Sequence, residues 1–352
     1  MTTPSLPDLT LTQMLRAHAQ ERPDALALRQ KDFGIWQAYS WRDYYNRARH
    51  FGLGLRAMGL EEGGHVAIIS ENRVEWVIAQ MGIGMVRGIC VGVYPTSPWN
   101  EVAYVLEHSD ASIVVCEDQE QTDKVLEAWP QLPQLKHTIA IDMKGLRYYP
   151  EPPAAFEDIE ARGREYEKDH PGLVDELLDG QRMDDTALMI YTSGSTGRPK
   201  GAMISWGNLH AAAPGLIELL QADDRGSSLS YLPLCHVAEQ AVTNIAPVYA
   251  GSSVSFGESL RTVQEDLREI APTFFLGVPR IWEKVHSSIY IKIQETGRLR
   301  QALFKWAMFD HPTHAYLDPT SAIIPARNAV HHDDGHRDEI YAYFKNKMKG
   351  NA

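Results

Sequence analysis

The sequence has little cysteine, no excess of positive charge and no long uninterrupted apolar run. Its 352 residues include only three cysteines, Cys90, Cys116 and Cys235, which are widely spaced and form no Cys-x-x-Cys pair. This spacing disfavours a disulfide framework or a zinc site and indicates reduced thiols in the core of a cytoplasmic protein. The formal net charge of -12 argues against a general nucleic-acid-binding role, which requires a basic surface.

The sequence also offers no evident membrane or export segment. Its first residues lack the basic and apolar regions of a signal peptide. The most apolar stretch, residues 76–94, is interrupted by Gln80 and Arg87 and contains several glycines. These features fit a buried helix followed by a strand better than a membrane span, so we predict no transmembrane segment.

What the sequence does contain is one stretch with unusual chemistry. Residues 191–201 have the sequence Tyr-Thr-Ser-Gly-Ser-Thr-Gly-Arg-Pro-Lys-Gly and follow an apolar run, 187–190, that is typical of a buried strand. Its glycines allow left-handed backbone conformations, and successive backbone N–H groups that face one concavity bind anions. Further donors come from four hydroxyl side chains and one lysine: Thr192, Ser193, Ser195, Thr196 and Lys200. The stretch therefore predicts a loop that wraps the phosphates of a nucleotide.

Two other interpretations of this stretch are weaker. Glycine, serine, threonine and proline also mark ordinary loops, but an ordinary loop needs no such set of donors behind a buried strand. A Walker-type phosphate loop needs a Gly-Lys pair where this chain has Pro199-Lys200. Pro199 also removes a backbone donor where a Walker helix would begin. The pattern indicates a phosphate loop of another kind.

The stretch resembles the phosphate-binding signature of the AMP-forming adenylating enzymes, which include acyl-CoA synthetases, luciferases and peptide-synthetase adenylation domains. That signature is Tyr-Thr-Ser-Gly-Thr-Thr-Gly-x-Pro-Lys-Gly, and this chain differs only at Ser195, which keeps a hydroxyl. The resemblance implies that Thr192 binds magnesium and the β,γ-phosphates of ATP. It implies that Lys200, as a catalytic residue, neutralises charge and orders the loop. It also implies that the phosphates are cradled by Ser193, Gly194, Ser195, Thr196 and Gly197.

Upstream of this stretch, strand-like and helical patterns alternate. Short apolar runs predict strands at 65–70, 89–94, 112–116 and 137–141. Apolar positions at three- and four-residue steps predict helices at 40–58, 74–85, 97–106 and 121–129. Alternation on this scale predicts an α/β fold in which parallel sheets are layered with helices.

Two sequence features predict details of these helices, namely their N-caps and a segment for close packing. Ser40 and Ser97 are predicted N-caps, the second with Pro98 at the first helical position. Residues 52–57, Gly-Leu-Gly-Leu-Arg-Ala, resemble a dinucleotide fingerprint but lie inside a predicted helix with no strand before it. We interpret them as a surface for close helix packing.

Downstream of the phosphate loop, a strand-like segment at 227–232 runs into Pro-Leu-Cys-His at 233–236. Strand ends of this kind lie at the carboxyl edge of a sheet, where ligands of open α/β folds bind. By context alone His236 is more simply a half-buried structural histidine. The segment resembles the family's histidine motif at the acyl-adenylate pocket, however, which favours a catalytic role for His236. A Cys235–His236 nucleophile is disfavoured, since neighbours on an extended chain point to opposite faces.

Three further segments bear on the acyl substrate. Residues 94–98 and 276–280 resemble parts of long-chain acyl-CoA synthetases, the first an architectural segment and the second a lining of the acyl pocket. Arg280 keeps two interpretations, a pocket residue and a salt-bridge partner at a helix start. Gln240 stands where some relatives carry an aromatic gate to a fatty-acyl tunnel, which leaves the chain-length preference open.

Strands at 252–256 and 273–278 flank a predicted helix that Thr262 and Glu265 would cap. The inward face of this helix is formed by Val263, Leu267 and Ile270.

The resemblance ends near residue 308. The family's Tyr-Gly-x-Thr-Glu segment, its ribose-binding aspartate and its mobile domain with a catalytic lysine have no counterpart in the sequence. Residues 310–352 are polar, and their His-His-Asp-Asp-Gly-His at 331–336 is explained more simply as a solvated tail than as a metal site. We expect the N-terminal portion of an adenylate-forming fold, truncated and incomplete, at 1–309 and a poorly ordered tail at 310–352.

The resemblance implies that a medium- to long-chain fatty acid is activated through acyl-AMP to acyl-CoA, with ATP, Mg²⁺ and coenzyme A. Whether this chain is itself an enzyme stays open. The alternative is a non-catalytic fragment that binds phosphate groups or a partner protein. We expect a cytoplasmic location, with peripheral contact at the inner face of a membrane as an open alternative for an enzyme of lipid substrates.

Overall fold

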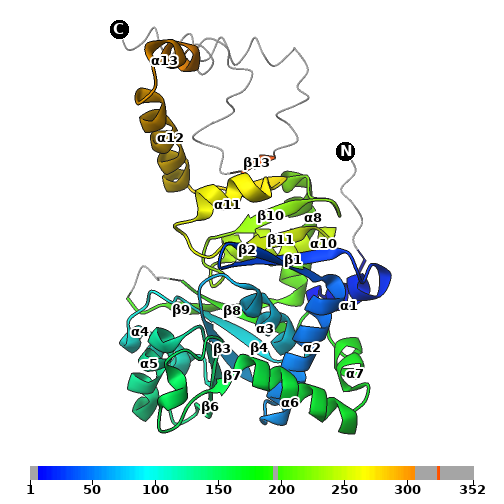
Figure 1. Cartoon of the computed structure of the whole chain (residues 1–352). Coiled ribbons are helices and arrows are strands. Elements are labelled where there is room, and N and C mark those ends of the chain that lie inside the picture. The colour runs from blue at the N-terminus through cyan, green and yellow to red at the C-terminus, as the bar shows by residue number, and fades with distance from the viewer. Residues whose placement is uncertain (1–6, 193–196, 306–322, 326–352) are drawn as a thin grey trace. The chain divides into compact units, whose positions relative to one another are not determined.

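The chain forms two compact units, Met1–Asp266 and Leu267–Ala352. The computed structural model describes residues 7–192, 197–305 and 323–325. Within these residues the first unit contains a seven-stranded and a four-stranded sheet, and the second contains a two-stranded sheet (Figure 1).

The seven-stranded sheet has the strand order β7-β6-β5-β3-β4-β8-β9. Its strands are β3 (His65–Ile69), β4 (Ile89–Val93), β5 (Ala111–Cys116), β6 (His137–Ala140), β7 (Ala154–Ala155), β8 (Thr186–Thr192) and β9 (Lys200–Ser205). All neighbours pair in parallel except β8 and β9, which form an antiparallel hairpin around the predicted phosphate loop. The expected parallel sheet is therefore confirmed, with β9 as an unpredicted addition. β9 is an edge strand whose apolar run, Ala202–Ile204, has only three residues, all of them exposed or half-buried.

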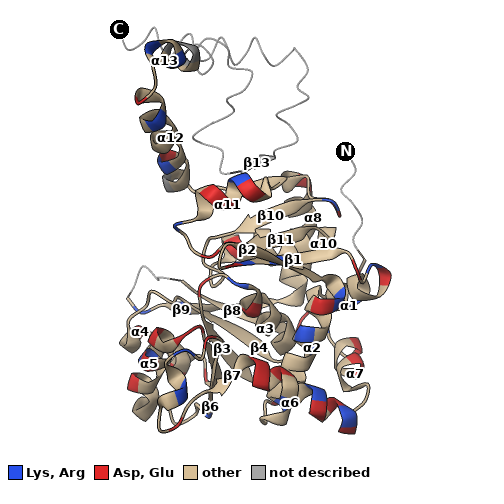
Figure 2. Cartoon of the chain, viewed as in Figure 1, with Lys and Arg blue, Asp and Glu red and all other residues tan. Residues whose placement is uncertain are grey.

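Helices cover both faces of this sheet, as expected for an α/β fold. Alternate residues of β3 point to opposite faces: Val66 and Ile68 pack into one core cluster, and Ala67 and Ile69 into another. The first cluster includes apolar residues of α2 (Trp41–Ala57), α3 (Val74–Met85), α6 (Phe156–Asp169), α7 (Leu173–Asp179) and α8 (Trp206–Leu220). The second includes those of α4 (Trp99–His108) and α5 (Gln119–Ala128). The inner strands β3, β4 and β8 carry no Lys, Arg, Asp or Glu (Figure 2).

The four-stranded sheet has the order β10-β11-β1-β2. Strands β10 (Ser227–Ser230), β11 (Ser253–Phe256) and β1 (Leu26–Asp32) run in parallel, and β2 (Ile35–Ser40) closes an antiparallel hairpin with β1. The remaining helices of this unit are α1 (Leu11–Glu21), α9 (Val237–Glu239), the π-helix η3 (Gln240–Ile245), α10 (Ala246–Ala250), and the 3₁₀ turns η1 (Trp129–Gln131) and η2 (Leu146–Tyr148). Helix α11 (Val263–Ile270) crosses the division between the units.

The predicted helix caps have different outcomes. Ser40 caps α2 as expected, within a capping box that Asp43 completes. The prediction for Ser97 is wrong by one residue: Pro98 is the N-cap of α4, and no side chain caps this helix. Ser97 instead precedes the N-cap, and its hydroxyl donates to Oε2 of Glu101, in the first turn of α4, at 3.0 Å.

The second unit contains a short antiparallel pair, β12 (Phe274–Leu276) with β13 (Ile323–Pro325), and two helices, α12 (Pro279–Gln294) and α13 (Arg298–Lys305). Pro279 is the first residue of α12, so Arg280 lies at a helix start. No α12 residue whose exposure is described is fully buried. The predicted boundary at 309/310 and the histidine-rich segment at 331–336 lie outside the described residues.

The glycines at 52–57 form a packing surface, as predicted, and not a nucleotide loop. A methyl group on Gly52 would lie 2.3 Å from the carbonyl oxygen of Gly82 in α3, and one on Gly54 would lie 2.1 Å from that of Ile159 in α6. No side chain fits at either distance, so these glycines let α2 approach two helices at backbone contact.

We expect Gly54→Ala to lower the free energy of unfolding by about 1–3 kcal/mol, because the added methyl overpacks the contact between α2 and α6. Gly215→Ala is the matched control: Gly215 lies inside α8 with nothing within 4 Å of an added methyl. This control should be neutral or stabilising by up to about 1 kcal/mol. Urea unfolding followed by tryptophan fluorescence measures both, and equal midpoints for Gly54→Ala and the parent would contradict the packing.

Candidate functional site

The register of the β8–β9 hairpin sorts the residues of the predicted phosphate loop into two groups. Thr192 pairs with Lys200, and Tyr191 pairs with Gly201. Because successive residues of a strand point to opposite faces, Thr192 and Lys200 share one face and Tyr191 and Gly201 the other. Side chains of directly opposed residues start about 5 Å apart. The hairpin thus puts the side chains of Thr192 and Lys200 on one face, and both residues are exposed.

The other face of the hairpin is structural. The Tyr191 hydroxyl forms a 2.8 Å hydrogen bond with His108 Nδ1 at the end of α4, and burial raises the pKa of Tyr191 to about 12. A methyl on Gly201 would lie 3.1 Å from the ring of Tyr191, so glycine leaves room for this ring. Tyr191 and Gly201 therefore anchor the hairpin and do not face a ligand.

Helix α4 also anchors the second side of the loop. The Tyr104 hydroxyl donates to the carbonyl oxygen of Pro199 at 2.9 Å. The Arg198 guanidinium lies over the Tyr104 ring, 5.2 Å from its centroid. This contact keeps a second cation beside Lys200, although the sequence had suggested no role for Arg198.

Of the seven residues predicted to bind phosphates, three lie within the described part of the chain: Thr192, Gly197 and Lys200. Gly197 has φ +119°, a conformation that other residues rarely adopt, and nothing lies within 4 Å of an added methyl. Its glycine is therefore required by the backbone and not by crowding. Ser193, Gly194, Ser195 and Thr196 lie outside the described residues.

His236 follows β10 and belongs to the segment Tyr231–His236, which we call the histidine loop. A methyl placed on Gly92 in β4 would lie 2.8 Å from the Cα of Cys235, so this loop rests directly on β4. Gly92 in turn pairs with Ile190 of β8, two residues before Thr192. The histidine loop therefore rests near the carboxyl end of β4, the strand beside β8.

The His236 side chain is exposed and is the N-cap of α9. Its Nδ1 accepts a hydrogen bond from the backbone N–H of Ala238 at 3.1 Å. A neutral ring that accepts at Nδ1 carries its proton on Nε2, so Nε2 is the donor that His236 can offer to a ligand.

Cys235 is unsuited to act as a nucleophile beside this histidine. Its side chain is buried, and burial raises the pKa of the thiol to about 12. The disfavoured Cys235–His236 pair therefore finds no support in the geometry.

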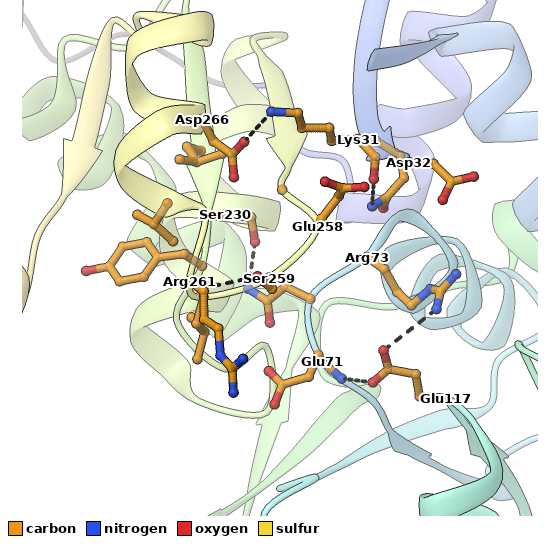
Figure 3. A pocket seen from close by; sticks show the side chains of 17 residues that line it. Lys31, Asp32, Glu71, Arg73, Glu117, Ser230, Glu258, Ser259, Arg261 and Asp266 are labelled. Carbon is orange, nitrogen blue, oxygen red and sulfur yellow. Dashed lines mark hydrogen bonds and ion pairs between the residues drawn. The ribbon is translucent and has the colours of Figure 1, made fainter. Parts of the chain in front are cut away.

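A cavity of about 450 Å³ lies beside the histidine loop, at the carboxyl ends of strands from both sheets (Figure 3). Its wall comes from the ends of β1, β10 and β11 and from the segments that follow β3 and β5. Many of its side chains are charged, and several pair across it: Lys31 with Asp266, and Arg73 with Glu117 (Figure 3). No predicted site residue lines this cavity, although Ser230 and Tyr231 connect it to the histidine loop.

The Lys31–Asp266 ion pair was not predicted. Lys31 Nζ lies 3.0 Å from Asp266 Oδ1, and the exposed side-chain fractions are 7% and 0%. Asp266 also accepts a 2.7 Å hydrogen bond from the Thr262 hydroxyl. The signal for its burial was present, since Asp266 follows Val263 by three residues on the inward face of α11. The prediction placed Leu267 on that face instead, and Leu267 is only half-buried.

The predicted acyl-pocket segment lies in the second unit. The Gly277 carbonyl oxygen accepts a 2.8 Å hydrogen bond from the Trp282 Nε1–H, and a methyl group on Gly277 would lie 2.3 Å from the Trp282 ring. Gly277 is thus required by the packing of Trp282 at the start of α12. The side chain of Arg280 lies outside the described set, so both of its interpretations stay predictions.

Magnesium would find few protein ligands at the hairpin. Among the described residues, no three His, Cys, Asp or Glu side chains are placed to hold a metal ion together. Magnesium commonly uses one or two protein ligands and takes the rest from substrate phosphates and water. A single hydroxyl from Thr192 fits this mode of binding.

The fold of the described residues is similar to part of the fold of solved fatty-acid ligases. The long-chain-fatty-acid-CoA ligase FadD1 from Archaeoglobus fulgidus superposes with a TM-score of 0.66 at 17% identity, covering 82% of this chain and 56% of that one. The fatty acyl-adenylate ligase from L. pneumophila, solved with acyl adenylate and pyrophosphate, gives 0.58 at 20% identity and covers 76% and 44%. At these identities the likeness shows the fold alone, and this chain has part of that fold.

The family model described as AMP-binding enzyme matches residues 15–315, and the chain belongs to this family. The long-chain-fatty-acid–CoA ligase ACSBG2 of Xenopus laevis is 32% identical over 315 residues, which are 86% of this chain and 41% of the relative. ACSBG1 of Homo sapiens is 31% identical over 322 residues, covering 87% and 43%. The chain thus spans about 40% of the length of the curated relatives it matches. None of the helices in the described part of the chain combines the length and apolarity needed to cross a bilayer.

We expect the three thiols of the native protein to be unreactive toward a chromogenic disulfide reagent at pH 8. Burial raises the pKa of Cys116 and Cys235 to about 12 and that of Cys90 further still, so the thiolate fraction is about one in ten thousand or less. All three should react after denaturation in urea. One fast-reacting thiol in the native chain, lost in Cys235→Ser, would reinstate Cys235 as a nucleophile.

We expect Asp266→Asn to lower the free energy of unfolding by about 3–5 kcal/mol, because it removes the anion that faces the buried Lys31 ammonium. Asp175→Asn is the matched control, since Asp175 is 62% exposed and pairs with Arg16 at the surface. That change should cost less than about 1 kcal/mol. Urea midpoints compare the two variants, and equal effects would mean that the Lys31–Asp266 pair contributes no more than a surface pair.

Proposed function

We propose that the chain takes part in the ATP-dependent activation of a medium- to long-chain fatty acid, through acyl-AMP to acyl-CoA. The observation that carries this proposal is the pairing of Thr192 with Lys200 at the base of the phosphate loop. Membership of the AMP-binding enzyme family supports the general reaction. The names of the relatives, which are long-chain-fatty-acid–CoA ligases, support the acyl substrate.

The reaction consists of two displacements. A carboxylate oxygen of the fatty acid attacks the α-phosphorus of ATP, and the bond to pyrophosphate breaks to give acyl-AMP. The thiol sulfur of coenzyme A then attacks the acyl carbon, loses its proton and displaces AMP. The protein contributes positioning and the neutralisation of phosphoryl charge more than covalent chemistry.

Each described site residue has a role in this scheme. The Lys200 ammonium neutralises charge on the phosphates, and the Thr192 hydroxyl binds the β,γ-phosphates and magnesium, which neutralises further charge. The backbone at Gly197, with Ser193, Gly194, Ser195 and Thr196, cradles the phosphates. His236 offers its Nε2–H to the acyl group or the α-phosphate from the neighbouring strand end.

The position that holds an aromatic gate in some relatives is not a free gate here. Gln240 is buried, accepts hydrogen bonds from Gln80 and Asn244, and donates to the carbonyl oxygen of Leu234 at 2.7 Å. A side chain with all these partners cannot swing aside without leaving buried polar groups unpaired. Chain-length preference therefore rests on other residues, and a series of acids from acetate and benzoate to palmitate would establish it.

The second candidate is a phosphate- or partner-binding protein without ligase activity, and an assay of the 352-residue chain distinguishes the two. The matched relatives have more than half of their length outside the alignment with this chain. The sequence likewise lacks the family's Tyr-Gly-x-Thr-Glu segment. Removing one preorganised electrostatic contact typically slows an enzyme about a hundredfold or more, so these 352 residues assayed by themselves should turn over very slowly.

We therefore expect the purified 352-residue chain to make no acyl-CoA from ATP, Mg²⁺, coenzyme A and palmitate, and to bind ATP weakly. Lys200→Ala should weaken ATP binding, measured by calorimetry, by about tenfold or more, since a charge-assisted contact is lost. Lys144→Ala, which removes a lysine of a surface turn, is the control. Release of AMP at a normal ligase rate would refute the non-catalytic alternative, and an unchanged affinity in Lys200→Ala would remove Lys200 from the phosphate site.

A further inference from the structure

The histidine loop has no regular secondary structure, yet its backbone is bound by a small set of side chains. Five of its polar backbone atoms are held in this way: the N–H groups of Tyr231, Leu232 and Leu234, and the carbonyl oxygens of Leu232 and Leu234. Their partners are the side chains of Asn72, Glu239 and Gln240. Backbone groups outside helices and sheets otherwise need water, so this arrangement replaces solvent with fixed protein partners.

Asn72 reaches the loop from the other sheet. It lies in the segment between β3 and α3, and its amide oxygen accepts from the Leu234 N–H at 3.1 Å. Its amide nitrogen donates to the carbonyl oxygen of Leu232 at 2.5 Å and to the Ser230 hydroxyl at 2.8 Å. One side chain thus ties the carboxyl end of the seven-stranded sheet to the loop that leaves the four-stranded sheet.

Glu239 holds the same loop from behind. Its side chain is fully buried and accepts hydrogen bonds from the N–H groups of Tyr231 and Leu232, both at 3.2 Å. The hydroxyls of Ser230 and Thr243 also donate to it, each at 2.6 Å. No charged side chain of the described residues is bonded to Glu239: the groups that face it from β10, the β3–α3 segment and η3 are Ser230, Asn72 and Thr243.

We propose that Asn72 and Glu239 are positioning residues that clamp the histidine loop and fix the place from which His236 meets a ligand. The role of the clamp in the reaction rests on the proposed function of His236, whereas the clamp itself does not. Neither residue faces the phosphate hairpin, and neither follows from the family's histidine motif. Both act through the backbone of the loop.

The opening of the clamped loop should depend on pH through the ionisation of Glu239. Burial raises the pKa of the Glu239 carboxyl from near 4.5 to about 7, even though four donors act in the opposite direction. The closed loop therefore holds a proton that the carboxyl would release into water on opening. A rise in pH from about 4.5 to about 7 therefore favours opening of the loop, and the loop is held more tightly at pH 6 than at pH 8.

Amide hydrogen exchange, measured by mass spectrometry on peptides spanning residues 231–240 of the full chain, tests the clamp. After correction for intrinsic exchange, the parent should lose protection between pH 6 and 8, and Glu239→Gln, which cannot ionise, should show no such change. Asn72→Ala should speed exchange at Leu234 by about tenfold or more, since its buried hydrogen bond is lost. Glu258→Gln, on the rim of the same cavity, should match the parent at every pH.

Parent-like exchange in Asn72→Ala, or the same pH response in Glu239→Gln as in the parent, would overturn the clamp. If Glu239→Gln fails to fold, Asn72→Ala and the pH response of the parent decide the matter. Loss of protection over the whole chain, and not at residues 231–240 alone, would show a general structural role and would also count against the proposal.

The link to His236 is tested with a non-hydrolysable palmitoyl-adenylate analogue, palmitoyl sulfamoyl adenosine, in the same variants. Asn72→Ala and His236→Ala should each weaken its binding by about tenfold, and the double variant should be no weaker than either, since both changes remove one contact. Additive losses would contradict positioning through His236. If the parent itself does not bind the analogue, the proposed function fails for this chain, and the exchange measurements still decide whether the clamp exists.

Discussion

The hydrogen-bonded register of β4, β8 and β9 determines where every candidate ligand group lies. Pairing of Thr192 with Lys200 puts a hydroxyl and an ammonium on one face of a hairpin. Pairing of Gly92 with Ile190 brings β4, and the histidine loop that rests on it, to the same edge. A slip of one residue in β9 would turn Lys200 to the face that Tyr191 occupies. The proposed recognition of phosphate thus depends on strand pairing as much as on the glycines of the predicted loop.

Much of this arrangement could be predicted from the spacing of apolar residues and from the order of the elements along the chain. The strands β3, β4, β5 and β8 are buried on both faces, so they stand out as short apolar runs, and the helices between them show three- and four-residue spacing. The glycines of α2 could be assigned to packing because they fall inside a helical pattern with no preceding strand. The phosphate loop could be located because its donors are contiguous in sequence.

The parts that could not be predicted are those that depend on contacts distant in sequence. Asp266 is buried because a lysine 235 positions earlier meets it, and Glu239 is buried because hydroxyls and N–H groups of two other segments converge on it. Nothing near Glu239 in the chain distinguishes it from the exposed acids that give this protein its negative charge, whereas Asp266 at least shares a helical face with Val263. Strand β9 escaped notice for another reason: its apolar run, Ala202–Ile204, is shorter than the runs that predict strands.

These buried polar groups are concentrated where the sheets end, and this placement has a physical basis. Inside the sheets, backbone groups pair with each other and side chains can be apolar, as the uncharged strands β3, β4 and β8 show (Figure 2). At the carboxyl edge the chain leaves the sheet, and each freed N–H or carbonyl must find another partner or water. Loops whose backbone groups bond only to water would be mobile, whereas a reaction that relies on positioning needs its groups held in place before the substrate arrives. Buried acids and amides at this edge provide that order without regular secondary structure, and the free energy spent on their burial is offset by the hydrogen bonds they accept. The charged cavity and the histidine loop share Tyr231 for the same reason, since both begin where β10 ends.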